Sequence, residues 1–418
     1  MGRFFQGEVP KEAAINPDVV DSIIAAELSK LSVEDREKAY LDIHGVSQPK
    51  DESPDLIQSS LMEMETAMKE LANREAYDLA KSMDPHYVMN DEFRLKFLRA
   101  DLFNAKKAAI RLCRHFQLKM DLFGADKLAL DITQDDLGKE EMDVLYSGYG
   151  RILPQHDQTG RLVNVLIANP DHPTEAILRR AFYTATTVQS EDSEAQRRGT
   201  VTIAYYLGHG PTSGFNSDIS WKMPKMNEGL PMRVVAIHMC YDTGAWTPVH
   251  SVVKLAFNTF AKVRIRMHYG SHKECLASLQ RHGIKPSIIP ISDNGKPADL
   301  DSFQQSLRRQ RKRERVNKPK RLKIFVPSEY DVLLGRGTPI QNFIGNKRLR
   351  SLVLDFQKQY EKAPKGIKIA IAQEIVHLVY QASGMFLKRD GETWITANNY
   401  TAKDKVSALF RTNRLQQK

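Results

Sequence analysis

The charge along this chain of 418 residues reverses near residue 300. Residues 1–300 carry 36 Lys and Arg side chains against 41 Asp and Glu, whereas residues 301–418 carry 25 against 10. The formal net charge is therefore −5 in the first part and +15 in the second. The length fits two or three ordinary domains. We therefore predict a multi-domain chain in which two physically different parts are joined.

The two parts meet in a basic segment, which we assign as a linker over residues 296–323. It follows the turn-rich stretch Pro290–Pro297, and ten of the sixteen residues in 308–323 are cations. So many like charges cannot pack on one another, so the segment is expected to be a solvated helix or a tether. A nuclear import signal, an arm on nucleic acid and a membrane-surface anchor all fit this charge.

The pattern of apolar residues predicts helices first and a sheet afterwards. Apolar residues recur at spacings of three and four over 55–123, which predicts an all-α subdomain at 55–135 after an N-terminal extension, 1–54. Beyond Gly160, helical stretches alternate with short continuous apolar runs, which predicts an α/β domain with a mostly parallel sheet at 136–295. The runs are Leu162–Ala168, Val201–Leu207, Arg233–Cys240 and Arg264–Tyr269.

The sequence lacks the signatures of several classes of protein. No run approaches the ~18 apolar residues of a membrane span, and the N-terminus lacks a secretory profile, so a cytoplasmic protein is expected. Cys113, Cys240 and Cys275 are odd in number and lie in apolar segments, which predicts buried free thiols. Phosphate-binding loops, nucleophile elbows and zinc-protease motifs are missing. We therefore expect no enzymatic activity, no catalytic residue, no metal and no cofactor.

Two histidines remain as candidates for chemistry. His209 lies between two glycines after a strand end, where ligands of α/β proteins often bind, so a hydrolase around His209 stays a minor alternative. His238 alternates with apolar residues along a buried strand, which is typical of a histidine in the core.

An unusually apolar helix is predicted near residues 247–262. Its apolar residues recur at spacings of three and four, with Lys254 and Lys262 off that face. Such a helix is either part of the core or a flap that covers an apolar ligand and touches a membrane.

The helical entry segment Phe93-Arg-Leu-Lys-Phe-Leu-Arg-Ala-Asp-Leu-Phe-Asn-Ala-Lys-Lys-Ala108 resembles the CRAL-TRIO family of hydrophobic-ligand carriers. Gly160-Arg161, Leu230–His238 and Phe257–Ser271 agree with that family in order and spacing, so the resemblance covers about 55–292. It implies a helical subdomain beside a lipid-binding domain that encloses one apolar molecule, with 247–262 as a movable gate. It also implies transient contact with a membrane surface. Met232 stands where phosphoinositide-binding relatives have an acidic residue, which argues against inositol recognition.

Candidate ligand-binding residues come from the apolar strands and the gate. Only one face of each strand can line a cavity, so about half of them are expected to face elsewhere. Two cations at the start of the last strand, Arg264 and Arg266, are candidates for contact with a ligand phosphate. The cavity candidates are Val165, Ile167, Ile203, Tyr205, Val235, Ile237, Met239, Val253, Phe257 and Phe260.

The carboxy-terminal part has a distinctive set of motifs. Tyr330-Asp-Val-Leu-Leu-Gly-Arg-Gly337, Gly345–Val353, Lys368–Val376 and Phe386–Ile395 together resemble an uncharacterised domain that is expanded in diatoms, over about 327–415. The expected fold is a small basic α+β domain at 324–418 with a hairpin at Asp390-Gly391. The family offers no established activity.

The basic residues leave the partner of this part open. Helix–helix–hairpin–helix order with a basic hairpin resembles a winged nucleic-acid binder in outline, and anionic lipid is the other candidate partner. We therefore expect a non-enzymatic protein that binds, and transfers or senses, a lipid or similar hydrophobic molecule. The alternative is a nuclear, nucleic-acid-binding regulator whose carrier domain senses such a ligand. The polyanion-binding candidates are Arg308, Arg309, Arg311, Lys312, Arg313, Lys347, Arg348, Lys388 and Arg389.

Overall fold

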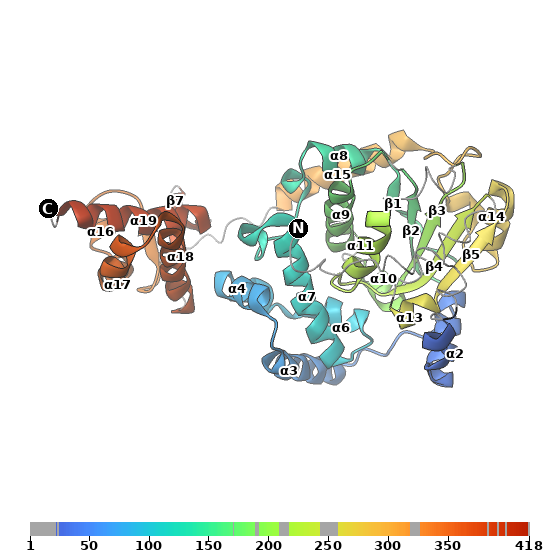
Figure 1. Ribbon diagram of the computed structural model, residues 1–418, viewed down its shortest axis with the longest axis horizontal. Helices are drawn as coiled ribbons and strands as arrows, with labels where there is room; N and C mark the ends of the chain where they lie inside the picture. Colours follow the sequence, from blue (N-terminus) through green and yellow to red (C-terminus); the bar gives the residue numbers. More distant parts are fainter. Residues whose placement is uncertain are drawn as a thin grey trace. The chain divides into compact units, whose positions relative to one another are not determined.

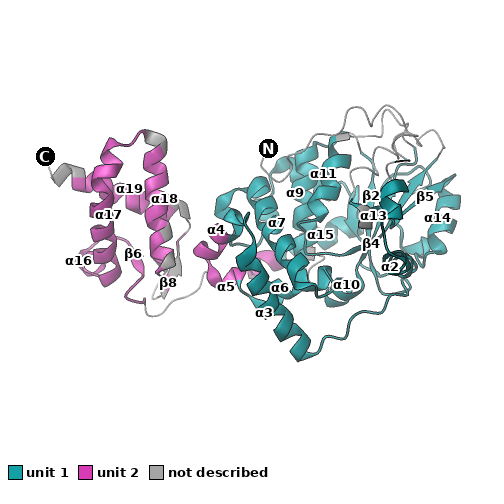
Figure 2. Cartoon of the chain, turned by 60° about the horizontal axis from the view of Figure 1, so that its bottom comes forward, with its two compact units in different colours: residues 1–77, 89–312 teal, residues 78–88, 313–418 magenta. Residues whose placement is uncertain are grey.

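The computed structural model describes Ser22 and residues 25–169, 171–188, 192–208, 217–242, 258–317, 327–382, 384–390, 393–397 and 399–416. The chain forms two compact units (Figure 2). Unit 1 comprises residues 1–77 and 89–312, and unit 2 comprises residues 78–88 and 313–418. Among the described helices, none is long and apolar enough to cross a membrane.

The described residues before 150 are mainly helical, and the periodicity predicted the helices over 55–123. Ser53, Asn90 and Asn104 cap their helices by accepting hydrogen bonds from backbone N–H groups of the first turn, which satisfies donors that have no partner inside the helix. The helices are α2 (Val33–His44), α3 (Pro54–Glu70), α4 (Glu75–Met83), α5 (Pro85–Val88), α6 (Asp91–Ala100), α7 (Ala105–Phe123) and α8 (Lys139–Tyr146), with 3-10 turns at Ala125–Lys127 and Gln134–Asp136.

A five-stranded sheet with the order β1-β2-β3-β4-β5 follows (Figure 1). Strands β2 to β5 are parallel to one another, and β1 is antiparallel to β2. The parallel strands coincide with the four apolar runs, which confirms the mostly parallel sheet. The short β1 was not predicted, because Arg151 interrupts any apolar run there. The strands are β1 (Gly150–Ile152), β2 (Leu162–Ile167), β3 (Thr200–Tyr205), β4 (Val234–Tyr241) and β5 (Ile265–Tyr269).

The two faces of this sheet pack against different helices. Val165 and Ile203 lie on one face, in a core that includes Leu279 of α14. Ala204 and Met239 lie on the opposite face, which α9 and α11 cover. All three cysteines of the chain are buried and free, as predicted. The helices that follow β2 are α9 (Thr174–Tyr183), a π-helical turn at Thr184–Val188, α10 (Ser193–Arg198), α11 (Ser217–Asn227), α13 (Thr259–Lys262), α14 (His272–Gln280), a 3-10 turn at Pro286–Ile288 and α15 (Leu300–Asn317).

The segment assigned as an N-terminal extension is part of the core of unit 1. Helix α2 places Ile43 in the core under β2 and β3 with no exposed surface. The buried carboxylate of Asp42 accepts hydrogen bonds from Arg233 at 2.9 Å and from Arg264 at 2.7 Å. Residues 33–44 are therefore held by the sheet and are not an appendage.

The segment assigned as a basic linker is also partly built into unit 1. Phe303 of α15 lies under the Arg151 guanidinium, 4.7 Å from it, and Leu307 is 7% exposed. The Leu307 carbonyl accepts a hydrogen bond from Gln134 at 3.0 Å, and Arg311 pairs with Asp135 at 3.0 Å. Of the two alternatives, a solvated helix or a tether, the structure shows a helix over Leu300–Asn317. Two apolar side chains four positions apart, Phe303 and Leu307, give this helix an inner face.

Truncation of Leu307 tests this attachment. Leu307→Ala is expected to lower the free energy of unfolding by about 2 kcal/mol, near the low end for buried leucines because a surface helix can relax into the gap. The change is measured by urea denaturation with Arg308→Ala as control, since Arg308 is exposed on the same helix. Equal, small effects of both substitutions would contradict the packed position of α15.

Unit 2 combines helices with a three-stranded sheet of order β6-β7-β8. Strand β6 is parallel to β7, and β7 and β8 form the expected antiparallel hairpin. Val332, Val353, Ile375, Phe386 and Val406 belong to its buried core. The elements are β6 (Val332–Leu334), α16 (Thr338–Gln341), α17 (Ile344–Lys362), α18 (Lys365–Gln381), β7 (Phe386–Asp390), β8 (Thr393–Thr396) and α19 (Asn399–Gln416).

The most distinctive motif of unit 2 has a structural explanation. The buried Asn346 side chain accepts a hydrogen bond from the Leu333 N–H at 2.7 Å and donates one to the Leu333 carbonyl at 2.8 Å. It thereby acts as a strand partner for β6. A Cβ on Gly345 would lie 2.0 Å from the Asp331 carbonyl oxygen, so only glycine fits. Asp331 also accepts a hydrogen bond from the Met385 N–H at 2.8 Å.

Candidate functional site

Unit 1 contains an apolar cavity of about 190 Å³ between the sheet and helices α9 and α11. Strands β2, β3 and β4 form its floor with alternate side chains, because neighbouring residues of a strand point to opposite faces. Apolar side chains dominate the lining, and no Asp, Glu, Lys or Cys is among the described lining residues. Representative lining residues are Asn164, Leu166, Ile177, Arg180, Ala181, Thr202, Ala204, Ile219, Met223, Ile237 and Met239.

Strand alternation divides the residues predicted from the sequence. Ile237 and Met239 line the cavity. Ile167, the last residue of β2, also lines it, although it belongs to the same core as Val165. The role of these three residues in binding stays a prediction. Four others lie in the core on the opposite face of the sheet and do not line it: Val165, Ile203, Tyr205 and Val235.

Most of the residues predicted to form the gate are outside the described part of the chain. Val253 and Phe257 are not described, and of residues 247–262 the structure places Asn258 and α13. Phe260 belongs to α13, but its side chain is outside the described part. His209 also lies outside the described residues. The gate and the minor hydrolase alternative therefore stay predictions.

The two arginines predicted to contact a ligand phosphate make polar contacts within the protein. Arg264 pairs with the buried Asp42 carboxylate at 2.7 Å. Arg266 donates to the backbone carbonyls of Val263 at 3.0 Å and Ile265 at 2.8 Å. Neither side chain lines the apolar cavity in the described structure. Contact of these two residues with a ligand phosphate stays a prediction.

The polar residues that line the cavity were not predicted from the sequence. Asn164 and Thr202 alternate with apolar residues in β2 and β3 and line the floor. Their polarity within otherwise apolar strands is the sequence feature that could have identified the strand face that lines the cavity. Arg180 of α9 is 4% exposed, and its Nε is buried without a hydrogen-bond partner. Burial lowers the pKa of Arg180 to about 10, so the side chain remains charged at neutral pH.

A second, more polar cavity of about 490 Å³ lies beside α2, α7 and the start of β4. Its cations include Arg111, Arg233 and Arg264, which face acidic partners. Arg111 pairs with Asp101 at 2.8 Å, and the other two pair with Asp42. Arg233 and Arg264 share the single carboxylate of Asp42, so the charges of the three arginines are only partly neutralised. The polar lining makes this cavity a weaker candidate for an apolar ligand.

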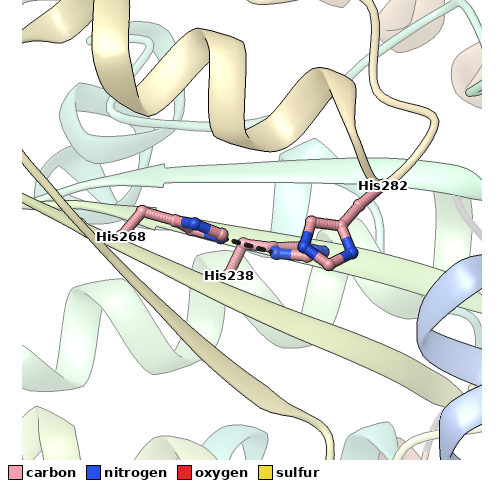
Figure 3. Close-up of side chains that lie close together, drawn as sticks. All are labelled: His238, His268 and His282. Atoms are coloured by element: carbon pink, nitrogen blue, oxygen red, sulfur yellow. Dashed lines mark hydrogen bonds between the residues drawn. The ribbon is translucent and has the colours of Figure 1, made fainter.

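Three histidines meet on the α14 face of the sheet (Figure 3). His238 of β4 and His268 of β5 share a hydrogen bond of 2.9 Å, and their rings stack with centroids 5.2 Å apart. His282 follows α14, with its ring centroid 4.7 Å from that of His238. Within this cluster, His238 Nε2 and His282 Nδ1 are buried without a hydrogen-bond partner.

The chemistry of this histidine cluster follows from its burial. Burial lowers the pKa of His268 and His282 to about 4 and that of His238 well below its usual value. Neutral imidazole is the form that binds metals. One nitrogen from each ring lies within 4.8 Å of the others, whereas ligands at about 2.0–2.1 Å from a zinc ion would be closer together. The rings would have to converge to hold an ion, and as they stand they form a neutral stacked cluster.

The predicted polyanion-binding residues form two groups, one in α15 and one in residues 347–389 of unit 2. Of the five candidates in α15, four are exposed, and Arg311 is paired with Asp135. In unit 2, Lys347, Lys388 and Arg389 are exposed. Arg348 pairs with Glu329 at 2.9 Å and lies over the Tyr330 ring. The exposed candidates in α15 are Arg308, Arg309, Lys312 and Arg313. Contact with nucleic acid or anionic lipid stays a prediction for all of them.

Comparison with known proteins gives partial matches. Residues 331–412 match the family model described as a domain of unknown function, DUF6824. Clavesin-1 of Xenopus laevis is 24% identical over 229 residues, which are 52% of this chain and 65% of that protein. The chain thus covers slightly less than two thirds of this relative's length. The crystal structure of Sfh5 aligns with a TM-score of 0.37 and 12% identity, over 62% of this chain and 99% of that chain. Residues 331–412 thus match the DUF6824 model, and about half of the chain is similar to clavesin-1.

Proposed function

We propose that unit 1 binds one small hydrophobic or lipid-like molecule without chemical change, in the cavity between the sheet and helices α9 and α11. The observation that carries this proposal is the apolar lining. Methionine, isoleucine, leucine and alanine side chains dominate the walls, and burial of apolar ligand surface against them is favourable by about 25 cal/mol per Å². Such concave apolar sites with a few polar groups are typical of ligand pockets.

The lining also argues against catalysis in this cavity. The described lining residues include Ser220 and His172, but no carboxylate or thiol stands among them to complete a nucleophile–base set. The CRAL-TRIO-like sequence supports the same conclusion, since the resemblance implies carriage of an apolar molecule. Transfer between membranes and sensing of the ligand both follow from such binding.

Filling the cavity tests the proposal. Ala204→Phe, on the cavity floor, is expected to weaken binding of the neutral fluorescent probe N-phenyl-1-naphthylamine about tenfold or more, because the added ring occupies the ligand volume. Ala72→Phe is the matched control, since Ala72 is exposed. Circular dichroism checks that overpacking, which costs about 1–3 kcal/mol in a filled core, has not unfolded the variant. Absence of probe uptake by the unmodified protein, or equal affinity of both variants, would refute the proposal.

A further inference from the structure

Arg180 is a buried cation without an anionic partner. No ion pair of Arg180 exists in the part of the chain that the structure describes, and its Nε lacks any hydrogen-bond partner. Transfer of a guanidinium out of water without a partner costs several kcal/mol. A fold retains such a group only where its other contacts outweigh that cost or where a ligand supplies the missing charge.

The fold makes specific room for this side chain. A Cβ on Gly150 of β1 would lie 2.2 Å from Arg180 Nη2, so the guanidinium rests against the glycine backbone. The same side chain borders the apolar cavity, together with Asn169 and His172. The His172 pKa is lowered, first by burial and then by the Arg180 charge, while the Asp171 and Asp143 charges act in the opposite direction.

Two other arginines of unit 1 pair with carboxylates. Arg179, the preceding residue, pairs with Glu175 at 2.7 Å and Glu141 at 3.1 Å. The buried Arg161 pairs with Asp157 at 2.6 Å and donates to the backbone carbonyls of three residues. Both guanidinium groups are compensated within the protein, which makes the uncompensated Arg180 at the cavity wall informative.

We propose that the cavity selects an apolar molecule that carries one small anionic group, a carboxylate or a phosphate monoester, and that Arg180 pairs with this group. The inference rests on the proposed function and adds the chemical class of its ligand. A guanidinium matches both anions with two parallel N–H···O bonds. The cavity volume of about 190 Å³ lies below the ~300–1,000 Å³ of sites for larger ligands, which favours a single chain with a small headgroup.

Competition against N-phenyl-1-naphthylamine tests this inference on the full-length protein. The competitors are octanoate, octyl phosphate and the neutral octan-1-ol, which share one chain and differ in the headgroup. The unmodified protein is expected to prefer at least one of the anions to the alcohol by about ten- to a hundredfold, as charge-assisted hydrogen bonds require. The preferred anion identifies the headgroup.

Two variants separate the charge of Arg180 from its shape. Arg180→Met is expected to abolish the preference for the anion while the neutral probe and the alcohol still bind, and Arg180→Lys to retain part of it. Arg179→Met is the control on the same helix and is expected to keep the full preference. Thermal unfolding without ligand verifies that Arg180→Met folds, and removal of an unpaired buried charge is expected to raise its Tm.

The outcomes distinguish the two proposals. Binding of the probe and of octan-1-ol without any preference for an anion would overturn the role of Arg180 and leave the proposed function intact. An anion preference that survives in Arg180→Met would do the same. Failure of every ligand, including the neutral probe, would overturn both proposals.

Discussion

Replacement of Asp42 by alanine is expected to lower the free energy of unfolding of unit 1 by about 3–5 kcal/mol, the cost of leaving buried charges unpaired. The Asp42 carboxylate, 2% exposed, lies 2.9 Å from Arg233 Nη1 and 2.7 Å from Arg264 Nη2 and accepts a hydrogen bond from Ser47 at 2.7 Å. Burial by itself raises the pKa of Asp42, but the Arg233 charge and the hydrogen bonds from Ser47 and Arg264 outweigh it, so the pKa is lowered.

Urea denaturation of Asp42→Ala measures this effect. Glu37→Ala is the control because Glu37 is exposed on the same helix, and it should change stability by less than about 0.5 kcal/mol. The triple variant Asp42→Ala, Arg233→Met, Arg264→Met should recover part of the loss, since it removes the unpaired cations as well. A loss below about 1 kcal/mol in Asp42→Ala would show that the two guanidinium groups do not depend on this carboxylate.

The same carboxylate marks a limit of inference from one sequence. Asp42 is separated from Arg233 by 191 residues and from Arg264 by 222. Helix α2 was foreseeable from its Ser32 cap and acidic first turn, but its docking on the sheet was not. An isolated charge carries no sign of a partner so far away. The N-terminal extension and the ligand contact of Arg264 were both assigned on local grounds, and neither assignment foresaw this long-range ion pair.

The sheet was more predictable than the cavity beside it. Four mainly apolar runs identify β2 to β5, because strands covered on both faces carry apolar side chains on both. Because both faces of these strands carry apolar side chains, the sequence does not indicate which face lines the cavity. Val165 and Leu166 are equally apolar, yet Val165 lies in the α14 core and Leu166 on the cavity floor. Only polar interruptions such as Asn164 and Thr202 distinguish the faces, and these residues are on the cavity side.

Acidification is expected to destabilise the protein through its histidine cluster. His238 and His268 have no more than 8% of their surface exposed, and burial lowers the pKa of His268 to about 4 and that of His238 further below its usual value. The unfolded chain, with a histidine pKa near 6.5, therefore binds more protons than the folded one as the pH falls below about 6.5. Stability is fully present above pH 6.5 and is lost toward pH 4, by up to about 1.4 kcal/mol per pH unit for each of these two residues.

Urea denaturation at a series of pH values between 7 and 4.5 measures this loss. His268→Gln retains a polar group that can hydrogen-bond to His238 but cannot titrate, so it should flatten the dependence of stability on pH by up to about 1.4 kcal/mol per unit below pH 6.5. His86→Gln is the control, because His86 is exposed on α5, and it should leave the slope unchanged. A slope that is the same in all three proteins would mean that His268 gains its proton equally in the folded and unfolded states. The neutral, stacked arrangement of His238 and His268 would then not persist in solution, since a charged His268 would have to be hydrated in place of that contact.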